Sequence, residues 1–252
     1  MLAVERKNKI KEILAEKKSI TVTELTSYFD VSEETIRRDL KQLAANGFLN
    51  KTYGGAYITD GVQNDVNVNL REHIHVEGKT KIATKCLDII NVGDSIFLDA
   101  STTALFVANL LENKSYTVVT NSLKIINTLA EKSNIKTIVI GGNLAHTSLS
   151  NIGRSAEIAL QNYFFDIAFI SCRSISMKHG ITDSNEQQAS IRHLAASHGN
   201  KICLMLDHTK IDQTSFAKIC NFDQIHHIIT DKPLSTEWRQ FLDAQNIHYH
   251  DD

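Results

Sequence analysis

Hydrophobic positions at the start of the chain recur with the spacing of helices. Ile10, Ile13 and Leu14 give a first helix one apolar side. Leu25 and Phe29 do the same for a short second helix further along the chain. The pattern therefore predicts two amphipathic helices close together in sequence.

The third periodic segment predicts a capped helix over about 33–46. Ile36, Leu40 and Leu43 follow the i, i+4, i+7 spacing of a helix with one buried side. Ser32 is a strong N-cap candidate, because a serine oxygen at this place accepts hydrogen bonds from backbone N–H groups of the first turn. The polar and basic residues between the apolar ones therefore face outward.

The three helices together match a helix-turn-helix motif. Thr21 and Glu24 form a capping box before the second helix, and Asp30-Val31 is long enough only for a turn. In this motif the last helix enters the major groove of DNA. The segment 48–57 then alternates in hydrophobicity and turns at a glycine pair, which predicts a small two-stranded wing.

Outward-facing polar residues of the third helix and of the wing are candidates for contact with DNA. A guanidinium binds a phosphate or a guanine edge, and a threonine offers a hydroxyl or a methyl group to a base. A second interpretation is that the basic residues only solvate a helix that also carries Glu33, Glu34 and Asp39. The caps, the supporting helices and the wing together favour DNA binding. The candidate DNA-binding residues are Ser32, Thr35, Arg37, Arg38, Lys41, Lys51, Tyr53 and Gly54.

Beyond residue 57 the pattern changes twice. The polar, Asn-rich stretch 58–75 predicts a linker, and after it short apolar runs alternate with helical segments. This alternation predicts an α/β domain with a mainly parallel sheet. The predicted organisation is a winged helix-turn-helix domain at 1–57, the linker at 58–75 and a larger α/β domain at 76–252. Strands are expected at 95–98, 117–120, 137–140, 167–170, 202–206 and 228–230.

Polar residues follow several of the predicted strands. Ligands gather at the carboxyl ends of parallel strands, where hydroxyl residues, backbone N–H groups and glycines allow a phosphate to approach. Asp99 would repel a phosphate and is expected to accept hydrogen bonds from ligand hydroxyls. Arg192 is a further candidate for contact with an anion, but we expect it to be a solvated residue of a helix. Ordinary helix caps and turns are the second interpretation. The candidate ligand-binding residues are Asp99, Ser101, Thr102, Thr103, Thr120, Asn121, Gly141, Gly142 and Lys210.

Composition narrows the class of protein. Residues 1–57 hold ten Lys and Arg against eight Asp and Glu, so their net charge is only slightly positive. Affinity for DNA must therefore come from the placement of individual side chains, from dimerisation and from the shape of the domain, and not from bulk charge. The four cysteines form no C-x-x-C pair, and no two histidines have a convincing metal-ligand pattern, so neither disulfides nor a metal are expected. No apolar run reaches the length of a membrane span and no signal peptide is recognisable, which predicts a soluble cytoplasmic protein.

The helix and wing motifs resemble those of a known family. Val31-Ser32-x-x-Thr35-Ile36-Arg37-Arg38-Asp39-Leu40, followed by Tyr53-Gly54-Gly55-Ala56, is similar to the N-terminal signature of DeoR-type bacterial transcriptional regulators. The resemblance implies a repressor of a sugar-catabolic operon, controlled by a phosphorylated sugar in a C-terminal sensor domain. It also implies that this domain has a fold like that of ribose-5-phosphate isomerase.

The second half of the chain carries further landmarks of this family, with departures. Asp99 to Thr103, Thr120-Asn121-Ser122, Gly141-Gly142 and Asp207-x-x-Lys210 match its sensor domain. Ser101 stands where many members have glycine, and the stretch 182–186 is more polar than is usual. Asp183 and Glu186 therefore join the candidate ligand-binding residues, because they can select a particular pattern of sugar or sugar-acid hydroxyls.

Two classes of function fit these observations. The first is a regulator that binds double-stranded operator DNA as a dimer or tetramer, with half-sites about 34 Å or a multiple apart, under the control of a phosphorylated sugar or sugar acid. The alternative is a sugar-phosphate isomerase-like enzyme with an accessory helical domain, in which Asp99, Asp166, Asp183 or Glu186 supplies the base. We expect the regulator, with no catalytic residues and no cofactor, because no complete set of base, orienting group and oxyanion donor is visible.

Overall fold

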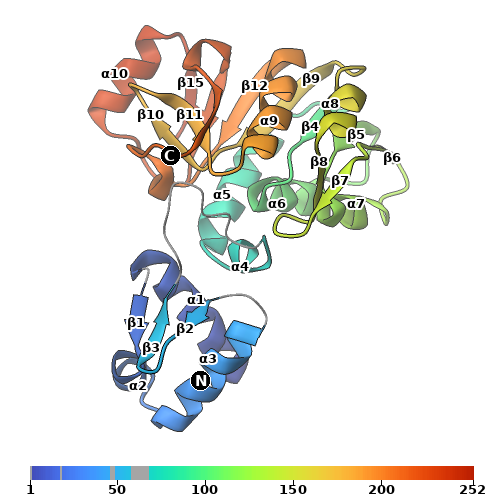
Figure 1. Cartoon of the computed structure of the whole chain (residues 1–252). Helices are drawn as coiled ribbons and strands as arrows, with labels where there is room; N and C mark the ends of the chain where they lie inside the picture. Colours follow the sequence, from blue (N-terminus) through green and yellow to red (C-terminus); the bar gives the residue numbers. More distant parts are fainter. Residues whose placement is uncertain (1, 18, 46–48, 58–67) are drawn as a thin grey trace. The chain divides into compact units, whose positions relative to one another are not determined.

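The chain divides into two compact units, Met1–Val76 and Glu77–Asp252 (Figure 1). The computed structural model describes residues 2–17, 19–45, 49–57 and 68–252. The first ten residues of the predicted linker 58–75 lie outside these ranges, and its later part contains a short helix, α4 (Val68–Glu72). None of the helices in the described ranges is long and apolar enough to cross a membrane.

The N-terminal unit contains the three predicted helices and one strand more than predicted. The wing strands β2 and β3 are antiparallel, and a third strand, β1, pairs with the other edge of β3. Residue 46, the predicted end of the third helix, and residue 48, the predicted start of the wing, lie outside the described residues. The elements that precede α4 in this unit are α1 (Ala3–Lys17), β1 (Ser19–Thr21), α2 (Val22–Phe29), α3 (Glu33–Ala45), β2 (Asn50–Lys51) and β3 (Gly55–Tyr57).

Local sequence accounts for the ends of these helices. The Glu24 N–H donates to Thr21 Oγ1 at 3.1 Å and the Thr21 N–H donates to Glu24 Oε2 at 2.8 Å, so the predicted capping box is present. Asp30 ends α2 in the left-handed conformation with φ of 51°. Ser32 Oγ then accepts from the Thr35 N–H at 3.3 Å, as expected of a cap at the start of α3.

The three helices enclose one small apolar core. Ile10 of α1, Leu25 of α2 and Ile36 and Leu40 of α3 are all fully buried. The sides that the periodicity assigned to a core therefore face one another. Asp39 is buried as well, with only 2% of its surface exposed, although the sequence analysis grouped it with the acids of a solvated helix.

The C-terminal unit is a seven-stranded sheet covered by helices on both faces (Figure 1). The strand order is β15-β14-β12-β9-β4-β5-β6 and every pairing is parallel, so the predicted α/β class is confirmed. The strands are β4 (Ser95–Leu98), β5 (Tyr116–Thr120), β6 (Ile135–Val139), β9 (Phe165–Ser171), β12 (Gly199–Met205), β14 (His227–Ile229) and β15 (His248–His250).

Successive residues of each central strand pack on opposite faces of the sheet. Phe97 of β4 belongs to one hydrophobic cluster with Leu160 and Trp238, whereas its neighbour Ile96 belongs to a second cluster with Ile82. One face is therefore covered by α8 (Arg154–Leu160), α9 (Glu186–His198) and α10 (Thr236–Ala244). The other face is covered by α5 (Val76–Leu87), α6 (Thr102–Leu110) and α7 (Leu123–Leu129).

Short antiparallel elements and α10 are absent from the sequence prediction. A second sheet is formed by β10 (Ser174–Ser176), β11 (Gly180–Asp183) and β13 (Ala217–Cys220). A hairpin is formed by β7 (Asn143–Ala145) and β8 (Ser150–Ile152). Strands of three or four residues are too short to leave a clear alternating pattern in the sequence.

The order of the large sheet reverses between β4 and β9. The chain proceeds from β4 outward to β5 and β6, returns to the other side of β4 with β9, and continues to β12, β14 and β15. In open α/β sheets the crevice outside the carboxyl ends of the two strands at such a reversal is the usual place for a ligand. The residues that follow β4 and β9 are therefore the first to consider.

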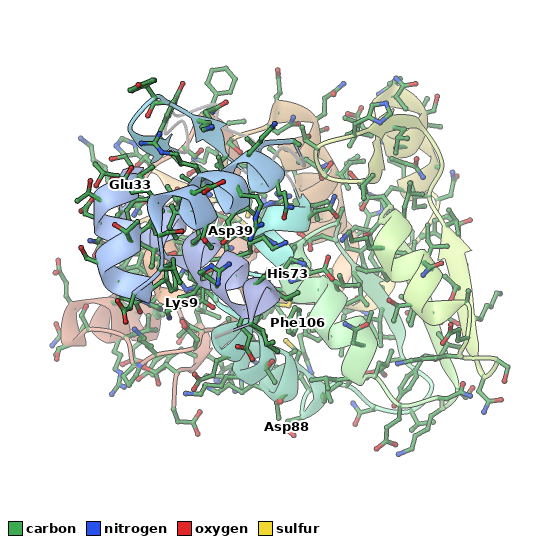
Figure 2. The ribbon with its side chains drawn as sticks, turned by 90° about the horizontal axis from the view of Figure 1, so that it is seen from below. Lys9, Glu33, Asp39, His73, Asp88 and Phe106 are labelled. Carbon is green, nitrogen blue, oxygen red and sulfur yellow. The ribbon has the colours of Figure 1, made fainter. Side chains whose placement is uncertain are left out.

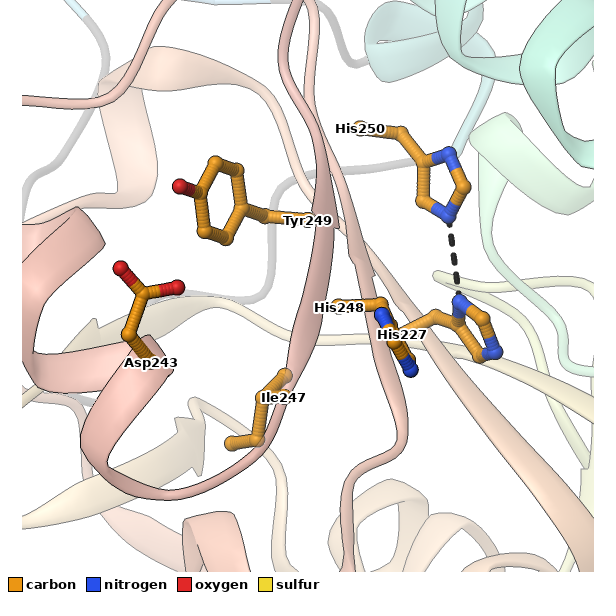
Figure 3. A pocket seen from close by; sticks show the side chains of 6 residues that line it. All are labelled: His227, Asp243, Ile247, His248, Tyr249 and His250. Carbon is orange, nitrogen blue, oxygen red and sulfur yellow. Dashed lines mark hydrogen bonds between the residues drawn. The ribbon is translucent and has the colours of Figure 1, made fainter.

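Three histidines stack at one edge of the large sheet, on the edge strand β15 and its neighbour β14 (Figure 3). The ring of His227 lies 5.2 Å from that of His248 and 5.3 Å from that of His250, centroid to centroid. His227 Nδ1 is 3.1 Å from His250 Nε2. Burial, and then the neighbouring His250 and His248, lower the pKa of His227 to about 4.

This stack makes stability depend on pH. The ordinary pKa of histidine is 6.5, so the unfolded chain takes up a proton on His227 at a higher pH than the folded chain does. The stabilising contribution is complete above about pH 6.5 and is lost as the pH falls toward 4. We expect His227→Gln to flatten the decrease in melting temperature below about pH 6.5, measured by circular dichroism, whereas His179→Gln at an exposed turn leaves the profile unchanged. The same pH profile in His227→Gln and in the unmodified chain would contradict this account.

Candidate DNA interface and ligand site

The exposed side of α3 carries basic residues. Arg38 and Lys41 are exposed and three positions apart, so they lie on neighbouring turns of the same side of the helix. Thr35 is half-buried, and its hydroxyl lies 3.0 Å from Ser32 Oγ at the helix start. Arg38 and Lys41 are therefore accessible basic residues on the side of α3 that faces away from the core, beyond the exposed acids Glu33 and Glu34 of its first turn.

Arg37 connects α3 to the wing. One guanidinium nitrogen donates to the Tyr53 carbonyl and the other to Glu33 Oε2, each at 3.0 Å. The guanidinium also lies 6.0 Å from the centre of the Tyr53 ring. Arg37 therefore holds the wing against the helix in this structure, and its predicted contact with DNA stays a prediction.

The wing presents an exposed aromatic residue beside a tight backbone crossing. Tyr53 is 95% exposed, and Lys51 and Gly54 are exposed next to it. A Cβ on Gly55 would lie 2.2 Å from the Ile20 carbonyl oxygen of β1, whereas a Cβ on Gly54 would meet nothing within 4 Å. Only Gly55 of the glycine pair is therefore required for the wing to pack.

A buried ion pair on the other side of α3 escaped the sequence analysis. Arg6 of α1 donates from Nε to Asp39 Oδ2 at 2.6 Å, and both side chains are almost fully buried. Figure 2 shows Asp39 on α3 and Lys9 on α1, the two helices that this ion pair joins. The signal was present in the sequence, because Asp39 follows Ile36 by three positions and precedes Leu43 by four, on the apolar side of the helix.

In the C-terminal unit, Asp99 joins the strand ends at the reversal of the sheet. Its Oδ1 accepts from the Ser101 N–H at 3.0 Å and its Oδ2 from the Ser171 N–H at 2.9 Å. Ser101 begins α6 and Ser171 ends β9, so one carboxylate ties the loop after β4 to the neighbouring strand. Ser171 was not among the predicted residues, although it directly follows the predicted strand 167–170.

Arg192 corrects an expectation, because it is buried and not solvated. It reaches from α9 to donate from Nε to Asp99 Oδ2 at 2.6 Å and from Nη1 to Asp183 Oδ2. The exposed fractions are 5% for Arg192, 1% for Asp99 and 6% for Asp183. Burial opposes ionisation of Asp99, but the Arg192 guanidinium and the donors from Ser101 and Ser171 hold the pKa of this carboxyl below its usual range.

Asp99 and Asp183 are thus parts of one charged network. All the oxygen contacts of Asp99 named above come from the protein itself, which fits positioning of the surrounding loops. The expected hydrogen bonds from a ligand to Asp99 stay a prediction. Ser101, Thr102 and Thr103 follow directly at the start of α6 and are also buried, with Ser101 Oγ accepting from the Ala104 N–H at 3.1 Å.

The end of β5 contributes a buried polar pair. Thr120 Oγ1 donates to the Leu98 carbonyl at 2.7 Å, which links it to the end of β4. Asn121 Nδ2 donates to the Asn151 carbonyl at 2.8 Å, whereas Asn121 Oδ1 is buried with no hydrogen-bond partner among the described residues. An unpaired buried carbonyl oxygen is costly, and a ligand hydroxyl is one group that would satisfy it.

Lys210 brings a cation to the same strand ends. It lies in a short 3₁₀ helix (His208–Lys210) after β12, and its Nζ donates to Ser171 Oγ at 3.2 Å. Asp207 Oδ2 is 3.8 Å from the same ammonium group, whose side chain is 19% exposed. The structure therefore brings Lys210 and Asp99 together at Ser171, and Asp183 joins Asp99 through Arg192.

Three predicted residues are exposed and make none of the contacts of this network. Gly141 and Gly142 are exposed after β6, and a Cβ on Gly142 would lie 2.7 Å from the Ile152 carbonyl oxygen of the hairpin. Glu186 is exposed at the start of α9 and lines a groove of about 610 Å³ with His193 and Phe216, between α9 and β13. Neither the glycine pair nor Glu186 makes one of the contacts just described for Asp99 and Lys210.

Comparison with known proteins identifies the class of regulator. Residues 6–61 match the model of the DeoR-like helix-turn-helix domain, and residues 74–232 match that of the DeoR C terminal sensor domain. The chain therefore belongs to the DeoR family of helix-turn-helix transcriptional regulators, as its motifs suggested. Its N-terminal unit is the DNA-binding domain and its C-terminal unit is the sensor domain.

Relatives match the chain over nearly its whole length. An uncharacterised HTH-type transcriptional regulator of Bacillus subtilis, YulB, is 38% identical over 98% of this chain and 96% of its own. The L-fucose operon activator of Haemophilus influenzae is 34% identical over 90% of this chain and 91% of its own. A solved ribose 5-phosphate isomerase from Methanocaldococcus jannaschii matches 53% of each chain at 15% identity, with a TM-score of 0.40.

The wing crossing gives a matched pair of variants. We expect Gly55→Ala to destabilise the DNA-binding domain by about 1–3 kcal/mol, because the added Cβ pushes β3 away from β1. Gly54→Ala should leave the free energy of unfolding unchanged, since the space around it is open. Urea unfolding of both variants measures the difference, and equal stability of the two would show that the crossing is not constrained.

The Asp99 network gives a second prediction. Asp99→Ala leaves Arg192 with one carboxylate instead of two, and breaking a buried ion pair costs about 3–5 kcal/mol. Because Asp183 remains, we expect a loss of about 3 kcal/mol, measured by differential scanning calorimetry of the sensor-domain transition. Glu77→Ala, which removes an exposed ion pair with Lys81, is the control and should leave this transition unchanged. A sensor-domain transition equally unaffected in Asp99→Ala would refute the structural role.

Proposed function

We propose that this protein binds operator DNA through α3 and the wing, and that a phosphorylated sugar or sugar acid bound at the strand ends of the sensor domain controls this binding. The observation that supports this proposal most directly is the capped helix α3, which exposes Arg38 and Lys41 and buries its apolar side in the core. A dimer or tetramer is the proposed functional form, because one such module contacts a single half-site and specific binding needs two.

The proposed DNA contacts follow from chemistry and exposure. Arg38 suits a bidentate contact with guanine or a phosphate, and Lys41 and Lys51 suit the backbone as point charges. Tyr53 at the wing tip offers a hydroxyl to a phosphate oxygen. The small basic excess of residues 1–57 fits a domain whose specificity depends on a few placed side chains and not on overall charge.

The proposed ligand site uses the two kinds of group that a sugar phosphate requires. Lys210 and the backbone N–H groups at the start of α6 suit the phosphate or carboxylate, because both carry positive charge, full or partial. The start of α6 follows β4 at the reversal of the sheet, and Lys210, after β12, reaches the end of β9 through Ser171. Asn121 Oδ1, buried without a partner among the described residues, suits a sugar hydroxyl. Gly141 and Gly142 would let the ligand approach the backbone at the end of β6.

Regulation, and not catalysis, is the proposed role of the sensor domain. Two relatives that match the chain over nearly its whole length bear the names of a transcriptional regulator and an operon activator. Asp99 and Asp183 are both engaged by Arg192, which leaves them poorly suited to accept a proton as a general base.

We propose repression as the sign of regulation. A reporter fused to the target promoter would then be more active when the gene for this protein is deleted.

Arg38→Ala tests the DNA interface. We expect the affinity for a fragment of its own promoter region to fall by about 5- to 150-fold in a gel-shift titration, because one base or phosphate contact is lost. The domain should stay folded, since Arg38 is exposed. Arg154→Ala, an exposed arginine of the sensor domain, is the matched control and should bind as the unmodified chain does. Unchanged affinity in Arg38→Ala would exclude the proposed interface.

Lys210→Met tests the ligand site. The unmodified chain is first screened by gel shift with a panel of phosphorylated sugars and sugar acids, and the compound that alters DNA binding is used. We expect Lys210→Met to bind DNA normally and to respond only at concentrations about tenfold higher, because a charge-assisted contact is lost. Lys178→Met at an exposed turn is the control. A normal response in Lys210→Met would rule out this site, and turnover of a panel compound would support the isomerase alternative.

A further inference from the structure

The ion pair between Arg6 and Asp39 is unusual for so small a domain. Its side chains are 7% and 3% exposed, and the Nε to Oδ2 distance is 2.6 Å. Removing two charges from water costs several kcal/mol, and apolar side chains of similar volume often stabilise a core equally well or better. A contribution to stability is therefore a poor explanation for this pair.

The position of the pair suggests a different role. Among the described residues, the side chains that α1 and α3 bury around this pair are apolar, with Ile10 and Leu14 in the same cluster as Leu40. An exposed hydrogen bond from Lys7 Nζ to Gln42 Oε1, at 3.0 Å, joins the same two helices at the surface. Apolar contacts have no preferred direction, so alone they do not fix how far α3 is rotated or shifted against α1. A short charged hydrogen bond tolerates little change of distance or angle. Asp39 directly follows Arg38 in the sequence, so a small movement of Asp39 moves the Arg38 side chain as well.

We propose that Arg6 is a positioning residue that fixes the rotation and register of the recognition helix through Asp39. The pair thereby sets the specificity of DNA binding more than the stability of the domain. On the far side, the bond from Arg37 to the Tyr53 carbonyl holds the wing against the same helix. The inference rests on the proposed function, because it assigns a role within operator binding.

Two variants separate specificity from stability. The double variant Arg6→Met with Asp39→Leu fills the same space with apolar groups and removes the directional bond. We expect its melting temperature to match or exceed that of the unmodified chain, and its operator affinity to fall about tenfold, the size of one lost base contact. Affinity for a DNA fragment of unrelated sequence should change by less than about twofold, because phosphate contacts tolerate small displacements.

The variant Asp39→Asn should behave in the opposite way. Its amide oxygen still accepts from Arg6 Nε, so the direction of the bond is kept, but the Arg6 charge is no longer neutralised. We expect a lower melting temperature with operator affinity within about twofold of the unmodified chain, measured well below the melting temperature. A control pair, Lys9→Met with Glu12→Met, removes an exposed ion pair of α1 and should alter neither quantity.

The outcomes are distinguishable. Loss of operator affinity in the apolar variant together with its retention in Asp39→Asn supports the proposal. Affinity that follows stability in both variants overturns it, as does an apolar variant that fails to fold or that binds the operator normally. If the unmodified chain itself shows no preference for its promoter over unrelated DNA, the proposed function fails independently of the ion pair.

Discussion

The buried carboxylate of Asp99 is the interaction on which the sensor domain depends. It accepts hydrogen bonds from Ser101 after β4, from Ser171 at the end of β9 and from Arg192 of α9, which are far apart in the chain. Because the carboxylate is charged and water is excluded, moving Arg192 away removes its ion partner, and moving Ser101 or Ser171 removes a hydrogen bond that stabilises the buried charge. The strand ends at the reversal of the sheet are therefore held in one arrangement, and Lys210 joins it through Ser171.

The DNA-binding domain uses the same physical device on a smaller scale. Asp39, like Asp99, is a buried acid paired with an arginine from another helix, and in each case the pair lies close to the residues proposed to contact a ligand. Apolar packing supplies most of the stability in both domains, but it specifies direction poorly. Charged hydrogen bonds supply the direction, which a recognition helix and a binding pocket both require.

The sequence predicted well the helices and strands that have a periodic apolar pattern, and it predicted the polar contacts poorly. Helix α3 and the parallel strands could be predicted because each buries one side or a whole run of apolar residues, which leaves a periodic signal. The second, antiparallel sheet and α10 were missed. The rule that ligands bind at the carboxyl ends of parallel strands pointed to Asp99 and Lys210, and both contact Ser171. The partners of Asp99 could not be predicted, since Arg192 comes from a distant helix and only the fold brings it there.

The central claim is that ligand binding in the sensor domain and operator binding in the N-terminal domain are coupled. The most direct test is isothermal titration calorimetry of the active phosphorylated compound with the free protein and with the operator-bound protein. Because coupling is reciprocal, the two dissociation constants should differ by the factor by which the compound changes operator affinity, about 5- to 150-fold. Equal dissociation constants in the two titrations would show that the domains act independently and would contradict the account.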